Sequence, residues 1–79
     1  MKYKSKKGEI FSFDITTYEN IPVEETYDEK TKQNFKVVEV WDNGHIVRKA
    51  MTRKDILVTN KNFYCLFPME WFEKNYERI

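Results

Sequence analysis

Apolar and polar side chains alternate through Glu9–Ile15, the first clearly patterned stretch of the chain. Phe11, Phe13 and Ile15 fall on one face of an extended strand, and the residues between them fall on the other. The pattern therefore predicts a half-buried strand. The lysine-rich segment Lys2–Ser5 is expected to pair with it as an edge strand, because lysines protect a sheet edge against unwanted pairing.

The dipeptide Asn43-Gly44 lies between two β-prone runs, Phe35–Trp41 and His45–Ala50. It is the strongest short hairpin signal in the chain, because a type I′ turn needs positive φ at both central positions. A two-residue loop sets the register and places Glu39 opposite Arg48 as an expected ion pair, worth under about 1 kcal/mol if exposed. The other expected cross-strand pairs are Asp42 with His45, Trp41 with Ile46, Val40 with Val47, and Val37 with Ala50.

A second hairpin is predicted nearer the C-terminus. Ile56–Thr59 and Phe63–Leu66 are β-prone runs, and the polar residues Asn60–Asn62 separate them. Asparagine tolerates the positive φ values of tight turns, so these three residues suit the loop.

Beyond this hairpin the apolar spacing changes from that of a strand to that of a helix. Met69, Phe72 and Tyr76 recur so that they share one helical face. Pro68 suits the first turn of a helix, because its missing N–H is not needed there. We therefore expect one helix near Pro68–Asn75, packed on the sheet through this face.

Together these elements predict an α+β fold in one small domain over residues 1–79. The expected architecture is a strongly bent, barrel-like antiparallel sheet of about five strands, closed by one C-terminal helix, since both faces of the central hairpin carry valines. Pro22 restricts residues 21–27 to an edge strand or loop, and residues 28–34 contain no apolar side chain and read as a loop. The predicted core consists of Phe11, Phe13, Val38, Val40, Val47, Leu57, Leu66, Phe72 and Tyr76.

Composition bears on the stability of the fold, on its attraction to charged partners and on its cellular compartment. A chain of 79 residues buries little surface, but a 16% aromatic content compensates in part. A net charge of +1 provides no general attraction to nucleic acid or membranes. The one cysteine, Cys65, lies in an apolar run, which favours a buried reduced thiol and an intracellular compartment. Neither a run of about 18 apolar residues nor the apolar part of a signal peptide is present, so we expect a cytoplasmic protein.

The sequence contains no recognisable catalytic or metal motif, and we expect neither an enzyme nor a cofactor. Two glycines are too few for a glycine-rich phosphate loop. His45 is the single histidine and stands next to the predicted turn, away from any nucleophile motif. Glu24 and Glu25 are adjacent, so on a strand they face opposite sides, and no His or Cys is near them in the sequence to complete a metal site.

Two groups of residues are candidates for binding. Arg48, Lys49, Arg53 and Lys54 form a compact basic group that could hold an anion such as a phosphate, although a solvated basic rim is the simpler interpretation. Trp41 and Trp71 are candidate anchors of a protein interface, because tryptophan is enriched at interfaces; both could equally belong to the core.

Three segments carry a resemblance to a known family: Met1–Lys7 (M-K-Y-K-S-K-K), Lys54–Leu57 (K-D-I-L) and Phe72–Glu77 (F-E-K-N-Y-E). They resemble the M-K-Y-R-K-K-like opening, the G-D-Y-I-like strand and the F-E-x-x-Y-E ending of small bacteriophage and prophage proteins of the PGDYG type. Lys54 stands where that family has glycine, the proline of its motif is absent, and Thr17–Asn34 has no counterpart.

The resemblance implies a phage-like origin and supplies no catalytic residues. We therefore expect an accessory binding protein that inhibits a host or host-defence protein by direct contact. One alternative is an oligomeric sponge that sequesters a nucleotide-like molecule at the basic group, with an aromatic ring stacked on the base. Another is a module for single-stranded nucleic acid, which the near-zero net charge disfavours.

Overall fold

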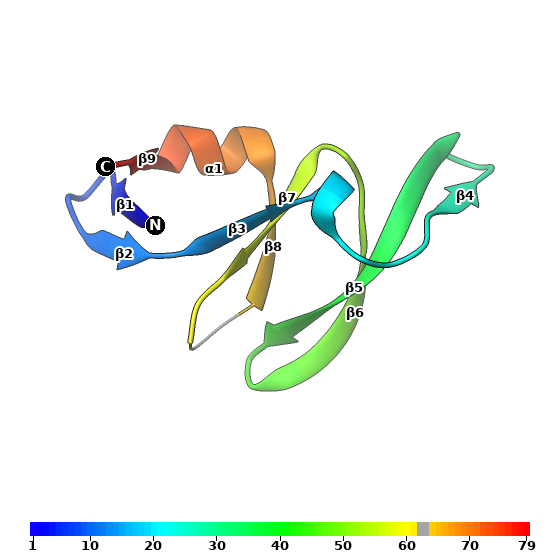
Figure 1. The fold of residues 1–79 in the computed structure, drawn as a ribbon, viewed down its shortest axis with the longest axis horizontal. Coiled ribbons are helices and arrows are strands. Elements are labelled where there is room, and N and C mark those ends of the chain that lie inside the picture. The colour runs from blue at the N-terminus through cyan, green and yellow to red at the C-terminus, as the bar shows by residue number, and fades with distance from the viewer. Residues whose placement is uncertain (62–63) are drawn as a thin grey trace.

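The structure is a computed structural model that describes residues 1–61 and 64–79, without the side chain of Asp42 (Figure 1). The described strands form three antiparallel sheets of three strands each. The strands are β1 (Lys2–Ser5), β2 (Ile10–Ser12), β3 (Asp14–Thr17), β4 (Thr26–Asp28), β5 (Gln33–Asp42), β6 (His45–Met51), β7 (Asp55–Thr59), β8 (Tyr64–Pro68) and β9 (Tyr76–Arg78). The helices are the 3-10 helix η1 (Tyr18–Asn20) and the α-helix α1 (Met69–Asn75).

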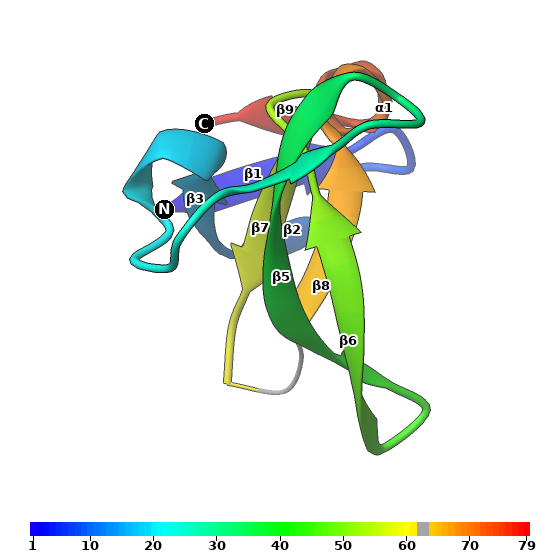
Figure 2. The ribbon, with the colours of Figure 1, turned by 90° about the vertical axis from the view of Figure 1, so that its right-hand side faces the viewer.

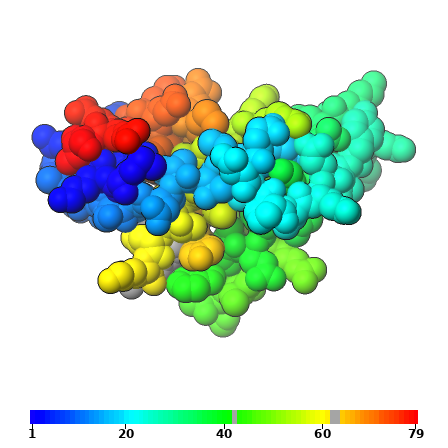
Figure 3. Space-filling view, viewed as in Figure 1, coloured from blue at the N-terminus to red at the C-terminus, as the bar shows by residue number. Residues whose placement is uncertain are grey.

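The first sheet, which we call the terminal sheet, has the strand order β2-β1-β9. Tyr3 in its central strand lies opposite Phe11 on one side and Arg78 on the other. The Ile79 N–H donates to the Lys2 carbonyl at 3.0 Å. Both ends of the chain therefore lie side by side at one end of the molecule (Figure 3).

The middle sheet has the order β3-β7-β8, and the third, the hairpin sheet, has the order β4-β5-β6. In the hairpin sheet, β5 and β6 pair from Asp42 opposite His45 to Lys36 opposite Met51. Every cross-strand pair expected from the sequence is found in this register. The turn has φ values of 51° at Asn43 and 80° at Gly44, as a turn with two positive-φ positions requires.

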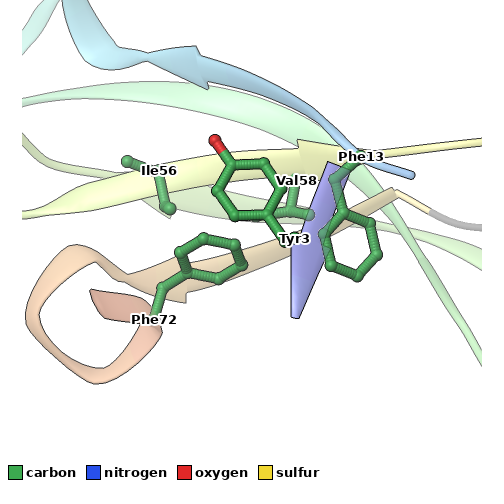
Figure 4. Close-up of a cluster of buried hydrophobic side chains, with 5 residues drawn as sticks. All are labelled: Tyr3, Phe13, Ile56, Val58 and Phe72. Atoms are coloured by element: carbon green, nitrogen blue, oxygen red, sulfur yellow. The ribbon is translucent and has the colours of Figure 1, made fainter. Parts of the chain in front are cut away.

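Two clusters of buried side chains hold the sheets together. The terminal core contains Tyr3, Phe13, Ile56, Val58 and Phe72 (Figure 4). The hairpin core contains Tyr18, Ile21, Val38, Val40 and Met51. Strand β7 contributes to both, because its Ile56 and Val58 enter the terminal core while Leu57 packs against the hairpin core.

The helix is fastened to the terminal core by aromatic contacts. The ring of Phe72 meets Tyr3 edge to face with 5.4 Å between centroids, and it stacks on Tyr76 at 4.9 Å. Met69 packs against the same cluster, so the helical part of the expected apolar stripe faces the sheet as predicted. Tyr76 also packs there, but it is extended and begins β9 instead of continuing the helix.

The predicted combination of a sheet-rich fold with one C-terminal helix is confirmed, but the closed or barrel-like single sheet is wrong. The described chain has nine strands in three sheets, and none of the sheets closes. One cause is the division of the expected strand Glu9–Ile15 at Phe13. The Phe13 N–H donates to the Met1 carbonyl at 2.9 Å, and the chain passes there from the terminal sheet to the middle sheet.

Other element boundaries also differ from the expectation. Pro68 ends β8 opposite Asp55 and precedes the helix, which begins at Met69. The short strand β9 was not predicted, because three polar-rich residues carry too little periodicity. Strand β4 begins within residues 21–27, for which the sequence left an edge strand or a loop open, and it lies at the edge of its sheet. The start of the predicted strand Phe63–Leu66 and the end of the predicted loop Asn60–Asn62 lie outside the described residues.

All nine side chains predicted for the core belong to, or pack against, one of the two clusters. The prediction missed the buried residues Tyr3, Tyr18, Ile21, Met51, Ile56 and Val58. No helix in the described part of the chain is long and apolar enough to cross a membrane.

The division into three sheets makes the molecule elongated. It measures 42 × 25 × 19 Å, with a radius of gyration of 13.5 Å. A compact domain of this length would have a radius of gyration of roughly 12 Å. Figure 2 shows the β5–β6 hairpin projecting beyond the other strands at its turn. This hairpin therefore presents much of its surface to solvent.

Replacing Phe72 by alanine should lower the free energy of unfolding by about 3–5 kcal/mol, because the ring is 4% exposed and contacts several other rings. Urea unfolding followed by circular dichroism measures this loss. Glu73→Ala, at an exposed position of the same helix, is the control and should change stability by less than about 0.5 kcal/mol. Equal stability of the two variants would show that α1 is not docked through Phe72.

Candidate functional site

Several exposed apolar side chains lie together on one face of the β5–β6 hairpin. We call it the hairpin face, and it consists of Val37, Glu39, Trp41, Ile46, Arg48 and Ala50. Strand alternation separates it from the buried face that holds Val38 and Val40. Val37 is 45% exposed, Trp41 42% and Ile46 65%. A face with three large exposed apolar side chains is a candidate contact surface for another molecule.

Trp41 is held in place although it is exposed. Its ring stacks on Tyr64 of β8, with centroids 5.2 Å apart and planes 21° from parallel. Tyr64 is itself 40% exposed, so the two stacked rings form an ordered, partly exposed aromatic surface at the turn end of the hairpin. Beside it lies a shallow hollow of about 460 Å³, whose lining includes Val37, Arg48 and Tyr64. Rigid aromatic side chains of this kind are typical interface anchors.

Trp71, the second predicted anchor, is on a separate surface. It is exposed on α1 and stacks on Phe67 at 5.0 Å. Helix α1 packs on the terminal core, whereas the β5–β6 hairpin packs on the hairpin core, and Figure 1 shows them on opposite sides of the middle sheet. The two tryptophans therefore do not form one patch. The prediction that they anchor an interface remains a prediction for each surface separately.

The four basic residues predicted to bind a ligand do not converge on one point. Arg48 is on the hairpin face, and Lys49, its neighbour in β6, points to the opposite side of the strand. Arg53 and Lys54 lie in the connection from β6 to β7. Arg53 and Lys54 line one hollow, whereas Arg48 lines another.

Arg53 is already engaged by carboxylates of the same chain. Its Nε donates to Glu19 at 2.8 Å, and its Nη2 donates to Glu25 at 2.7 Å. The guanidinium also lies 4.7 Å from the centroid of the Tyr18 ring. These contacts join the segment between β3 and β4 to the connection between β6 and β7. The ion pair expected between Glu39 and Arg48 is not formed, although the two residues occupy paired positions as predicted.

Lys36 is a buried charge that the sequence analysis missed. It is 7% exposed, and its Nζ donates to the carbonyls of Tyr18 at 2.8 Å and Ile21 at 3.0 Å. The ammonium also lies 4.5 Å from the centroid of the Tyr18 ring. The available signal was alternation, because Lys36 shares a strand face with Val38 and Val40. Its role is structural, because these hydrogen bonds hold η1 and the residue that follows it against the hairpin.

Tyr18 and Glu25 influence each other's titration. Burial raises the pKa of the Tyr18 hydroxyl, and the Glu25 carboxylate raises it further. The hydroxyl in turn lowers the pKa of Glu25, and the guanidinium of Arg53 also favours the charged carboxylate. The hydroxyl is close enough for these effects, but within the described part of the chain no hydrogen bond of regular geometry joins it to a partner.

A different group of side chains surrounds Lys54. Tyr27, Lys32 and Lys54 line a hollow of about 490 Å³, together with Arg53 and the amides of Gln33 and Asn34. Tyr27 is 57% exposed. An exposed ring and two lysines around one hollow are the combination expected for stacking a base and pairing a phosphate.

The other residues considered from the sequence lie on separate elements or connections. His45 is exposed beside the turn, Cys65 is half-buried in β8, and Glu24 is exposed next to Glu25. Among residues 1–61 and 64–79, no three His, Cys, Asp or Glu side chains are grouped so that they could hold a metal ion.

Comparison with protein-family models, with curated proteins and with solved structures finds no match for this chain.

The stability contributed by Glu25 should depend on pH, because its pKa is lower in the folded state than its ordinary value of 4.5. A carboxylate whose pKa is lowered on folding stabilises the folded state at pH values above its ordinary pKa. This stabilisation is lost as the pH falls through the pKa of the folded state. Glu25→Gln should therefore be less stable than the natural chain at about pH 7, and urea titrations down to about pH 3 should show the difference shrinking. Glu24→Gln is the matched control. A difference that stays constant with pH would contradict the assigned environment.

Proposed function

We propose that this chain is a non-enzymatic, phage-type accessory protein that binds a host or host-defence protein and inhibits it by direct contact in the host cytoplasm. The hairpin face is the observation that carries this proposal. It places Val37, Trp41 and Ile46 in solvent on an ordered strand pair, and Trp41 is preorganised by its stacking on Tyr64. Preorganised aromatic side chains lose little conformational freedom on binding, which favours affinity.

The phage-type part of the proposal is supported by where the family-like segments lie. Met1–Lys7 contains β1, Lys54–Leu57 begins β7, and Phe72–Glu77 spans the end of α1 and most of β9. Each contributes a side chain to the terminal core, namely Tyr3, Ile56 and Phe72. The three segments that resemble the PGDYG-type proteins thus form one structural unit. The segment without a counterpart, Thr17–Asn34, lies outside this unit.

Ile46→Arg should reduce binding to a captured bacterial protein at least about tenfold, because it puts a charge opposite Trp41, at the apolar turn end of the hairpin face. The measurement is a quantitative pull-down from a bacterial lysate, followed by titration of the captured protein. Ile10→Arg is the matched control, since Ile10 is 61% exposed on β2 near the chain termini. Trp71→Ala tests the other predicted anchor in the same assay. Equal loss in the Ile46 and Ile10 variants would contradict a specific role of the hairpin face.

A second candidate function is the sequestration of a nucleotide-like molecule by an oligomeric sponge. The hollow at Tyr27, Lys32 and Lys54 favours it, because the hollow combines an exposed ring with two lysines that form no ion pair among the described side chains. In this proposal the ligand binds beside Lys54, and Arg48 and Lys49 take no part. The remaining residue of the predicted basic group, Arg53, would act mainly by holding the loop.

Native mass spectrometry of gently purified protein should then show a nucleotide-sized added mass, and ADP should bind in isothermal titration. Lys54→Glu should abolish both signals, because it reverses one charge in the hollow. Lys49→Glu reverses an exposed lysine of β6 outside that hollow and should leave both unchanged. Absence of added mass and of ADP binding in the natural chain would exclude this candidate as stated.

A further inference from the structure

The outer edge of β6 is a long strand edge with no partner strand in the described chain. β6 ends the order β4-β5-β6, so it is hydrogen-bonded to β5 on one side only. It has seven residues, whereas the other strands that end a sheet have three to five. Such an edge offers a row of backbone donors and acceptors to another extended chain.

The register of the hairpin identifies which backbone groups face outward. In a two-residue hairpin the pair beside the turn, here Asp42 and His45, is the hydrogen-bonded type, and the two types then alternate. The N–H and C=O groups of Ile46, Arg48 and Ala50 are therefore directed to the free edge. These three residues are exposed. A strand added at this edge could therefore form hydrogen bonds with three alternate residues of β6.

The side chains of the same residues belong to the hairpin face. A strand added at the edge would place alternate side chains beside Ile46, Arg48 and Ala50. Ile46 offers an apolar neighbour, and Arg48 offers a positive one. Edge and face therefore form one continuous surface for an extended chain with alternating side chains.

The charges on β6 determine which kind of extended chain can pair with its free edge. Strand β6 contains Arg48 and Lys49 but no carboxylate, and neither cation forms an ion pair with a described side chain. Because adjacent strand residues face opposite sides, one positive charge is available on each face. A second copy of β6 would bring cations close to cations, which disfavours self-pairing at this edge. An acidic strand would meet an opposite charge on both faces.

We propose that the free edge of β6 binds an extended acidic segment by strand addition, with an apolar residue of that segment against Ile46. If the proposed function holds, this acidic segment is part of the target protein. Only the origin of the segment rests on the proposed function; the strand addition itself does not. Main-chain hydrogen bonds would supply affinity, and the two cations would supply selectivity.

The direct test uses the blocked peptide Thr-Thr-Glu-Glu-Val-Val-Thr and its counterpart with lysine in place of glutamate. In an antiparallel register this peptide sets a valine beside Ile46 and one glutamate beside each of Arg48 and Lys49. When each peptide is titrated into isotopically labelled protein, the backbone amide resonances of Ile46, Arg48 and Ala50 should shift most. The acidic peptide should bind at least about tenfold more tightly than the lysine peptide. Equal binding of the two peptides, no binding of either, or shifts centred on α1 would overturn the proposal.

Ala50→Pro separates strand addition from contact with the face. Proline removes the outward N–H of residue 50, which the β5–β6 ladder does not use. The variant should lose at least about tenfold in affinity for the acidic peptide, while Ala50→Thr, which keeps the N–H, should retain it. Retained binding by a folded Ala50→Pro variant would overturn strand addition.

Should Ala50→Pro fail to fold, the double variant Arg48→Glu/Lys49→Glu provides an independent test. It should reverse the preference and bind the lysine peptide more tightly. An unreversed preference would overturn the role of the two cations.

The variants also distinguish failure of this inference from failure of the proposed function. A captured bacterial protein that is lost with Ile46→Arg but retained with a folded Ala50→Pro would uphold the binding function and overturn strand addition. If no bacterial protein is captured while the acidic peptide binds at the edge, strand addition stands and the host-target proposal fails.

Discussion

Strand β7 is the constraint on which the rest of the structure depends. Its run Ile56-Leu57-Val58 is apolar at every position, so both faces must be covered. Ile56 and Val58 are buried in the terminal core, and Leu57 packs against the hairpin core. One short strand therefore joins two cores that contain few residues each. Loss of packing on either face of β7 would expose its apolar side chains to water.

The hairpin core is completed by a charge, because the loop after β3 has too few apolar residues to pack by itself. Lys36 donates two hydrogen bonds to carbonyls of this loop, and Arg53 joins Glu19 and Glu25 of the same segment. The ring of Tyr18 lies under both cations. Hydrogen bonds from charged donors are stronger than neutral ones, which suits a site where a few contacts must fix a segment.

This arrangement decides which surfaces are left for function. Cations that would make an anion site are divided, because Arg53 serves the fold while Arg48 and Lys49 lie on the projecting hairpin. The hairpin has one face on its core, and its other face and outer edge are exposed. An exposed apolar face beside an unpaired strand edge is costly to keep in solution unless a partner uses it. The proposed binding function follows from this combination.

The sequence by itself determined the local elements with strong chemical signals. Asn43-Gly44 specified the β5–β6 register, since few residues adopt positive φ, and the spacing of Met69 and Phe72 specified the buried side of the helix. The alternation of Phe11, Phe13 and Ile15 identified one buried face, because side-chain direction in a strand is a local property.

Only the tertiary structure decided how these elements are joined. The break at Phe13 depends on a hydrogen bond to Met1, and β9 exists because its residues reach β1, so neither leaves a periodic pattern in the sequence. The engagement of Arg53 likewise depends on carboxylates that are 34 and 28 positions away. Local pattern specifies which way a side chain points, but contacts between distant segments decide what it meets.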